Sequence, residues 1–163
     1  MVFCSLGTWQ LYRLQWKLNL INEIETGLEA EPIFYSKLNI KNYQKVKFDG
    51  IFDFKKQIYL YSLNKKGTPG YDIITPIKTK SNEILLVNRG WIRKDLKNNK
   101  NINEVKIELF EGVIKKITKP NPFKPDNNIL TNEWYSLKIP DLENFTGYKL
   151  NNYTLILQNN YNS

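Results

Sequence analysis

The stretch GYDIITPIKTKSNEILLVNRGWI (residues 70–92) contains two apolar runs separated by a short polar segment. Isoleucine, valine, tyrosine and tryptophan are concentrated in residues 71–78 and 83–92, as is typical of β-strands. Between these runs, Lys80-Ser81-Asn82 has the composition of a turn. The sequence therefore predicts that the two runs pair as an antiparallel hairpin.

Further short strands are predicted on both sides of this hairpin. Val46 and Phe48 precede Gly50, where we expect a bend or bulge because glycine adopts backbone conformations that strain other residues. A short helix is expected over residues 140–146, with Gly147 at its end. The other predicted strands cover residues 58–61, 134–137 and 153–157, and residues 104–118 form either one long strand or two short ones broken near Gly112.

Residues 6–24 have the pattern of a helix instead, and Gly27 is expected to end it. Two neighbouring apolar stripes recur at helical spacing: Leu11, Leu14, Leu18 and Ile21, and beside them Trp9, Trp16, Leu20 and Ile24. Together they are wider than the contact face of a surface helix, so we expect apolar surface that the sheet does not cover. The predicted fold class is α+β: a β-rich antiparallel barrel or sandwich at residues 29–163, with a long N-terminal helix at residues 1–28 and a short C-terminal helix.

The composition excludes several kinds of site. The 163 residues have the length of one domain and include no histidine. Ser-His-Asp or Cys-His catalysis and histidine ligation of zinc or haem therefore cannot be built from this chain alone. The single cysteine, Cys4, excludes an internal disulfide. Asp49, Asp53 and Asp72 are expected as scattered acids on or near turns, so we predict no catalytic residues, no metal site and no enzyme activity.

The net charge of +8 raises the alternative of a nucleic-acid-binding protein. Residues 31–100 hold 15 basic and 6 acidic residues. A basic barrel of this kind could bind single-stranded nucleic acid, with bases stacked on Tyr59 and Tyr61. Arginine, which makes the best contacts with phosphate and guanine, occurs only three times. Binding of single-stranded nucleic acid is therefore only the alternative hypothesis for the function of this chain, and nucleic acid is not the expected partner.

Three segments combine residue types in unusual order, and two of them place an arginine near a tryptophan. They are LGTWQLYR (residues 6–13) followed by Trp16 and Lys17, GYDIITP (residues 70–76) and LVNRGWI (residues 86–92). Together with residues 43–52 and, more weakly, residues 122–134, they follow the order of motifs in the Surfeit locus protein 1 family. The chain resembles this family over nearly its whole length, and the resemblance implies a non-enzymatic assembly factor for cytochrome c oxidase.

The resemblance also implies an arrangement at a membrane. Family members have a transmembrane helix, a soluble domain on the periplasmic or intermembrane-space side, and a second transmembrane helix. Residues 1–6 would then be the remnant of the first span, and the second span, which carries a histidine linked to haem a, would be absent here. The implied location is the inner or plasma membrane.

The implied role is delivery or stabilisation of haem a in the catalytic subunit of cytochrome c oxidase. The implied partners are that subunit, the haem a synthesis machinery and the lipid bilayer. Since the chain has no histidine, we predict that by itself it binds no haem and no other cofactor.

The family motifs also select candidate residues. The expected functional surface comprises Trp9, Gln10, Arg13, Asn88, Arg89, Gly90 and Trp91. The expected structural residues are Gly50, Gly70, Tyr71, Thr75, Pro76 and Trp134, with Gly70, Pro76 and Gly90 in turns or bends and Trp134 in the core. Two interpretations of Arg89 stay open: an ion pair with Asp72 across the hairpin, or a contact with a haem propionate, a lipid phosphate or a partner carboxylate.

Overall fold

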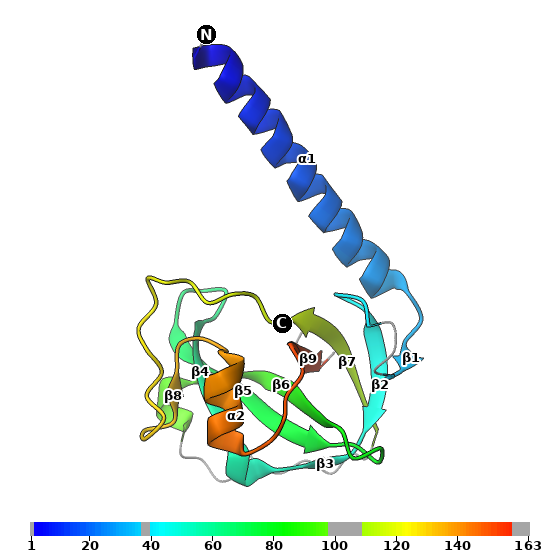
Figure 1. Ribbon diagram of the computed structural model, residues 1–163, viewed down its shortest axis with the longest axis vertical. Helices are drawn as coiled ribbons and strands as arrows, with labels where there is room; N and C mark the ends of the chain where they lie inside the picture. Colours follow the sequence, from blue (N-terminus) through cyan, green and yellow to red (C-terminus); the bar gives the residue numbers. More distant parts are fainter. Residues whose placement is uncertain (1, 37–39, 98–108, 158–163) are drawn as a thin grey trace.

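The N-terminal helix is present as α1 (Val2–Glu29), and it projects away from the strands (Figure 1). The computed structural model describes residues 2–36, 40–97 and 109–157. As predicted, α1 keeps apolar surface uncovered, since Trp9 is 53% and Leu11 68% exposed. Gly27 was expected to end the helix but lies inside its last turn. A Cβ at Gly27 would lie 2.5 Å from the carbonyl oxygen of Tyr43, so close packing explains this glycine.

Nine strands follow α1 within the described ranges, and the predicted short helix is α2 (Ile139–Thr146). The strands are β1 (Ile33–Phe34), β2 (Lys45–Asp49), β3 (Ile51–Phe52), β4 (Ile58–Leu63), β5 (Pro69–Lys78), β6 (Ile84–Arg93), β7 (Leu109–Lys116), β8 (Glu133–Trp134) and β9 (Tyr153–Leu157). Two short 3-10 helices, η1 (Phe54–Lys56) and η2 (Lys94–Leu96), follow β3 and β6. Gly147 ends α2 in the left-handed conformation, as predicted.

The predicted hairpin is confirmed, because β5 and β6 pair antiparallel with Thr75 opposite Val87. In the turn, Asn82 adopts a positive φ of 63°, which asparagine tolerates better than most residues. β7 differs from the strand predicted over residues 104–118. It runs unbroken through Gly112, where a side chain would press against the carbonyl of Ile156, and residues 104–108 lie outside the described ranges.

The sheet closes on itself through Gly50. β2 pairs with β7, and β3, only one residue further along the chain, pairs with β5. The remaining neighbours are β7 with β9, β9 with β6, and β6 with β5, so the pairing returns to its start. Gly50 has a φ of 152°, and a Cβ there would collide with the carbonyl oxygen of Lys78. The bend expected at Gly50 is therefore what turns the sheet into a barrel.

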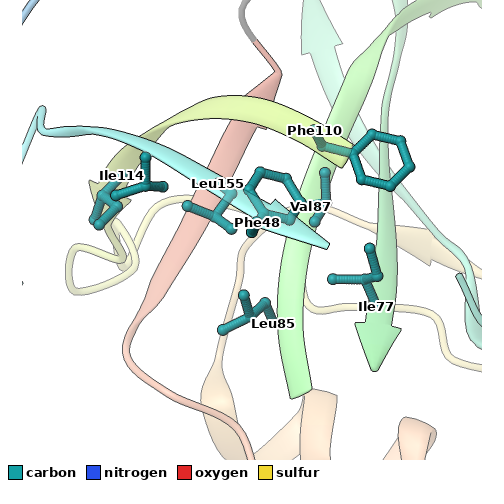
Figure 2. Close-up of a cluster of buried hydrophobic side chains, with 8 residues drawn as sticks. Phe48, Ile77, Leu85, Val87, Phe110, Ile114 and Leu155 are labelled. Carbon is teal, nitrogen blue, oxygen red and sulfur yellow. The ribbon is translucent and has the colours of Figure 1, made fainter. Parts of the chain in front are cut away.

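The barrel interior is filled by side chains from five strands of the ring. Figure 2 shows the labelled members of this cluster pointing toward one another between the strands. The cluster consists of Val46, Phe48, Ile77, Leu85, Val87, Phe110, Ile114 and Leu155, each at most 5% exposed. The rings of Phe48 and Phe110 stack with their centroids 5.6 Å apart.

A second core lies on the outer face of β5 and β6, under α2. It consists of Ile58, Ile74, Leu86, Trp134 and Leu142. Trp134 is fully buried, as predicted, and its ring packs edge-on against Phe145. Because residues alternate between the two faces of a strand, β5 and β6 contribute to both cores.

The α+β class is thus confirmed, but the sheet is mixed rather than purely antiparallel. β1 with β2, β4 with β8, and β6 with β9 pair in parallel. Strands that pair in parallel need a long connection, because a hairpin turn reverses the direction of the chain. Long connections precede both β8 and β9, which allows these strands to run parallel to β4 and β6.

Candidate functional site

The residues expected to form one functional surface lie in three places. Trp9, Gln10 and Arg13 are exposed on α1, where the Arg13 guanidinium carbon lies 5.4 Å from the centre of the Trp9 ring. Since α1 projects away from the barrel, this group is remote from β6, which carries the other four candidates (Figure 1). The structure therefore does not bring Arg13 and Arg89 together.

The four candidates on β6 are themselves divided between the two faces of the sheet. Asp72 lies opposite Trp91 and Ile74 opposite Asn88, so Arg89 and Gly90 together face the single residue Ile73. This is a β-bulge, and Gly90 takes up its distortion at a φ of 121°. Asn88 shares the outer face with Ile74, whereas Arg89, two residues after Val87, is directed to the inner face.

Arg89 lies at one end of the barrel interior against a buried glutamine. Its Nη1 donates a hydrogen bond to Oε1 of Gln57 at 3.0 Å. The same oxygen accepts a bond from the Thr75 hydroxyl at 3.1 Å, and Nε2 of Gln57 donates to the Tyr59 hydroxyl at 2.9 Å. Gln57 is only 4% exposed, and its amide fixes the position of the guanidinium.

Two phenylalanines flank the guanidinium of Arg89. Its central carbon lies 5.6 Å from the Phe52 ring centre and 5.0 Å from that of Phe54. Burial lowers the pKa of Arg89, and the nearby Tyr59 raises it slightly in return. The side chain stays charged at neutral pH because the ordinary pKa of arginine is so high. A half-buried cation between aromatic rings interacts strongly with an anion, since little water screens it.

The ion pair between Asp72 and Arg89 is not observed among the described residues, because the two side chains lie on opposite faces. Asp72 interacts instead with Asn88, Ser62 and Lys115. Burial raises the pKa of the Asp72 carboxyl, and these three neighbours partly oppose that shift. The Ser62 hydroxyl is buried beside the carboxyl without a hydrogen bond of standard geometry. The expectation that Asp72 lies at a turn was also wrong, because it lies within β5.

Gly70 and Pro76 were expected in turns or bends, but both lie inside β5. A Cβ at Gly70 would collide with the Trp91 ring and with the carbonyl of Ile92, so this glycine permits close packing. Pro76 lies between the stretches of β5 that pair with β4 and β3, where its carbonyl accepts a bond from the Asp53 amide at 2.9 Å. Its missing N–H therefore interrupts no strand pairing on that edge.

Tyr71 belongs to an aromatic cluster that holds a lysine. Its hydroxyl donates to Glu133 at 3.0 Å, and burial together with this bond raises the pKa of Tyr71 to about 12. The Lys97 ammonium lies 5.2 Å from the Tyr71 ring centre and 5.4 Å from that of Tyr59. Tyr59 and Tyr61, the rings on which the nucleic-acid alternative relies, both make T-shaped contacts with Tyr71.

A long hollow, which we call the lysine groove, crosses the outer face of the sheet. It consists of two adjoining hollows of 360 and 630 Å³ that share Asp72, Asn88 and Ile156 in their walls. Six lysines line it: Lys65 and Lys66 in one hollow, and Lys115, Lys116, Lys119 and Lys124 in the other. Gly90 and Trp91 line the 630 Å³ hollow, together with Lys65 and Lys66.

Sequence reasoning missed Gln57 and the lysine groove. Gln57 follows a lysine-rich 3-10 helix in a run with no motif, so nothing local marked it as buried. The groove joins lysines from two segments about 50 residues apart, and only the topology brings them together.

A model of the SURF1 family matches residues 1–162 of the chain. The chain belongs to the SURF1 family. It is 34% identical over 163 residues to the SURF1-like protein of Rickettsia bellii, an alignment that covers 95% of this chain and 66% of that protein. It is 33% identical over 169 residues to Surfeit locus protein 1 of Gallus gallus, covering 89% of the chain and 54% of the relative.

The human relative, Surfeit locus protein 1 of Homo sapiens, is 30% identical over 167 residues, covering 88% of the chain and 55% of the relative. This SURF1-family chain thus spans between half and two thirds of the length of these curated relatives. The family membership that the five sequence motifs indicate is therefore confirmed.

Haem a, which the family resemblance implies, does not fit this SURF1-family chain as a resident cofactor. Arg89 and the lysine groove offer cations for propionates, but the sequence supplies no imidazole to bind the iron. Among the described residues, no three or more cysteine, aspartate or glutamate side chains form a group that could hold a metal ion. None of the described helices is long and apolar enough to cross a membrane.

Proposed function

We propose that the chain is a non-enzymatic assembly factor for cytochrome c oxidase that acts by binding the catalytic subunit. The observation that carries this proposal is the match of the SURF1 family to residues 1–162. The described residues contain a fixed cation and a basic groove, which suit binding.

Arg89 is the residue we assign to the contact with the oxidase. Alternation along β6 directs the Arg89 guanidinium to the end of the barrel interior, and Gln57 holds it there. A guanidinium has five N–H donors in a fixed plane, so it can keep the bond to Gln57 and also bind a carboxylate. The anion would be a carboxylate of the catalytic subunit or a propionate of haem a that is carried as cargo.

The membrane is the proposed location, with the barrel on the periplasmic or intermembrane-space side. The exposed apolar residues of α1 and the stacked pair Arg13 and Trp9 support this location. Tryptophan and arginine commonly lie together at the level of lipid headgroups. α1 would then hold the barrel next to the oxidase subunit.

The proposal is tested by replacing Arg89 in cells that depend on this protein for their oxidase. Arg89→Ala and Arg89→Lys are compared with Arg93→Ala, a matched control because Arg93 lies on the same strand and pairs on the surface with Asp95. We expect the two Arg89 variants to lower the yield of haem-loaded oxidase several-fold and the control to leave it unchanged. Lysine fails as a replacement because it lacks the planar fork of donors.

Thermal unfolding of the same purified variants separates binding from folding. Normal oxidase yield in both Arg89 variants would refute the proposed contact. A large drop in melting temperature in both variants would instead assign Arg89 to structure alone, since the buried Oε1 of Gln57 would keep only the hydrogen bond from Thr75.

A further inference from the structure

We propose that the lysine groove binds an extended acidic peptide segment of a partner protein. The two hollows of the groove adjoin each other, since Asp72, Asn88 and Ile156 line both. This inference deepens the proposed function by giving the chemistry of the partner segment, and it is tested separately from Arg89.

The charge of the groove selects an anionic ligand with charges at both ends. Lys65 and Lys66 lie at one end, in the connection between β4 and β5. The four lysines at the other end lie on the last part of β7 and in the connection that follows it. Six exposed ammonium groups around a single carboxylate, that of Asp72, give the groove a positive potential that attracts anions.

The floor of the groove favours a peptide over a simple phosphate. Leu60, Ile74, Leu137 and Ile156 make much of the floor apolar. At its centre, the Asp72 carboxylate can accept hydrogen bonds from donors such as backbone N–H groups, while Oδ1 of the neighbouring Asn88 already accepts one from the Gly90 amide at 2.9 Å. A phosphate placed at the centre would be repelled by Asp72. An extended acidic peptide places its carboxylates at the lysines, apolar side chains on the floor and N–H groups near Asp72.

The test is fluorescence anisotropy with a fluorescein-labelled dodecapeptide of three Gly-Glu-Leu-Glu repeats and the full chain. A matched peptide of Gly-Gln-Leu-Gln repeats reports binding that does not depend on acidic groups. The groove variant carries Lys65→Gln, Lys115→Gln and Lys119→Gln. The control variant carries Lys41→Gln, Lys55→Gln and Lys94→Gln, which remove the same charge from exposed lysines outside the groove.

We expect the glutamate peptide to bind the wild type, and the groove variant to bind it roughly tenfold more weakly. The control variant should bind within about twofold of the wild type. Equal weakening in both variants, equal binding of the glutamine peptide, or no binding to the wild type would each overturn the proposal. If the triple variant unfolds, Lys65→Gln and Lys119→Gln are measured singly against Lys41→Gln and Lys94→Gln.

Two competitors test the class of ligand. Vesicles of phosphatidylglycerol and phosphatidylcholine, and an oligo-dT dodecamer, are added to the complex of the chain with the glutamate peptide. If the vesicles and the oligo-dT displace the peptide only weakly, and to the same extent from the groove variant and the control variant, the groove is specific for peptide. If either competitor binds the wild type more tightly than the peptide and loses that binding only in the groove variant, the groove belongs to lipid or nucleic acid instead.

Discussion

α1 and the barrel contain the same kinds of apolar residue, but only the barrel buries them. Eight large apolar side chains between Leu6 and Ile21 are each at least 50% exposed on α1. In the barrel, Phe48, Val87 and Trp134 are at most 2% exposed. The comparison teaches that an apolar stripe identifies the face of an element that avoids water, while the rest of the fold decides what covers it.

Trp134→Ala should have the largest effect on folding. The indole is fully buried, packs against Phe145 and donates a hydrogen bond to Oδ1 of Asn132 at 2.9 Å. Removing it leaves a cavity in the outer core, so we expect the free energy of unfolding to fall by about 3–5 kcal/mol. Urea denaturation measures the loss, and Trp134→Phe should lose less because a ring still contacts Phe145. A loss under about 1 kcal/mol would mean that the core can collapse around the gap.

Gly70→Ala should have an intermediate effect, and it contrasts a glycine of the barrel with one of α1. The added methyl collides with the Trp91 ring and the Ile92 carbonyl, so we expect a loss of about 1–3 kcal/mol in the free energy of unfolding. Gly7→Ala is the control, because no atom lies within 4 Å of the added Cβ and alanine favours a helix. If Gly70→Ala matched the control, the close approach of Trp91 to β5 would be disproved.

Asp72→Asn should stabilise the barrel modestly at neutral pH. Burial raises the pKa of Asp72 in the folded chain, so the folded state holds this proton more tightly than the unfolded state does. Stability therefore falls as the pH rises from the ordinary pKa of 3.8 through the raised value, and the penalty stays at higher pH. We expect the variant to be more stable than wild type at pH 7 and to lose this advantage below about pH 4. Urea denaturation of the variant and the wild type between pH 7 and about pH 4 measures the difference in stability. A stability advantage of Asp72→Asn that grew as the pH fell would contradict the prediction.

The double change Trp9→Ala and Leu11→Ala should have the smallest effect on folding. Both side chains are more than half exposed on α1, so we expect the free energy of unfolding to change by less than about 0.5 kcal/mol. Binding to lipid vesicles, measured by co-sedimentation, should weaken instead, because these residues supply apolar contact. A clear loss of stability would show that the barrel covers α1 in solution, and the contrast between the two regions would no longer hold.

Local sequence signals predicted the elements, but long-range contacts decided the site. The hairpin of β5 and β6, the bend at Gly50 and the end of α2 at Gly147 each depend on residues that are neighbours in sequence. The bond from Arg89 to Gln57 spans 32 residues, and although alternation from Val87 directs Arg89 inward, only the fold brings Gln57 beside it. A motif of consecutive residues cannot show that Arg89 and Trp91, two residues apart, face opposite sides of the sheet, because the bulge between them interrupts the alternation.

The closure of the barrel through Gly50 has a consequence for when the chain can fold. β2 leaves the ribosome early, yet its partner β7 and the adjoining β9 belong to the last part of the chain. Closing such sequence-distant pairs is slow, because the intervening chain must first be ordered. Until β9 has been made, the interior faces of β2 and β6 remain in contact with water. We therefore expect the barrel to complete its folding only after synthesis has passed Leu157, and a newly made chain to need protection from aggregation until then.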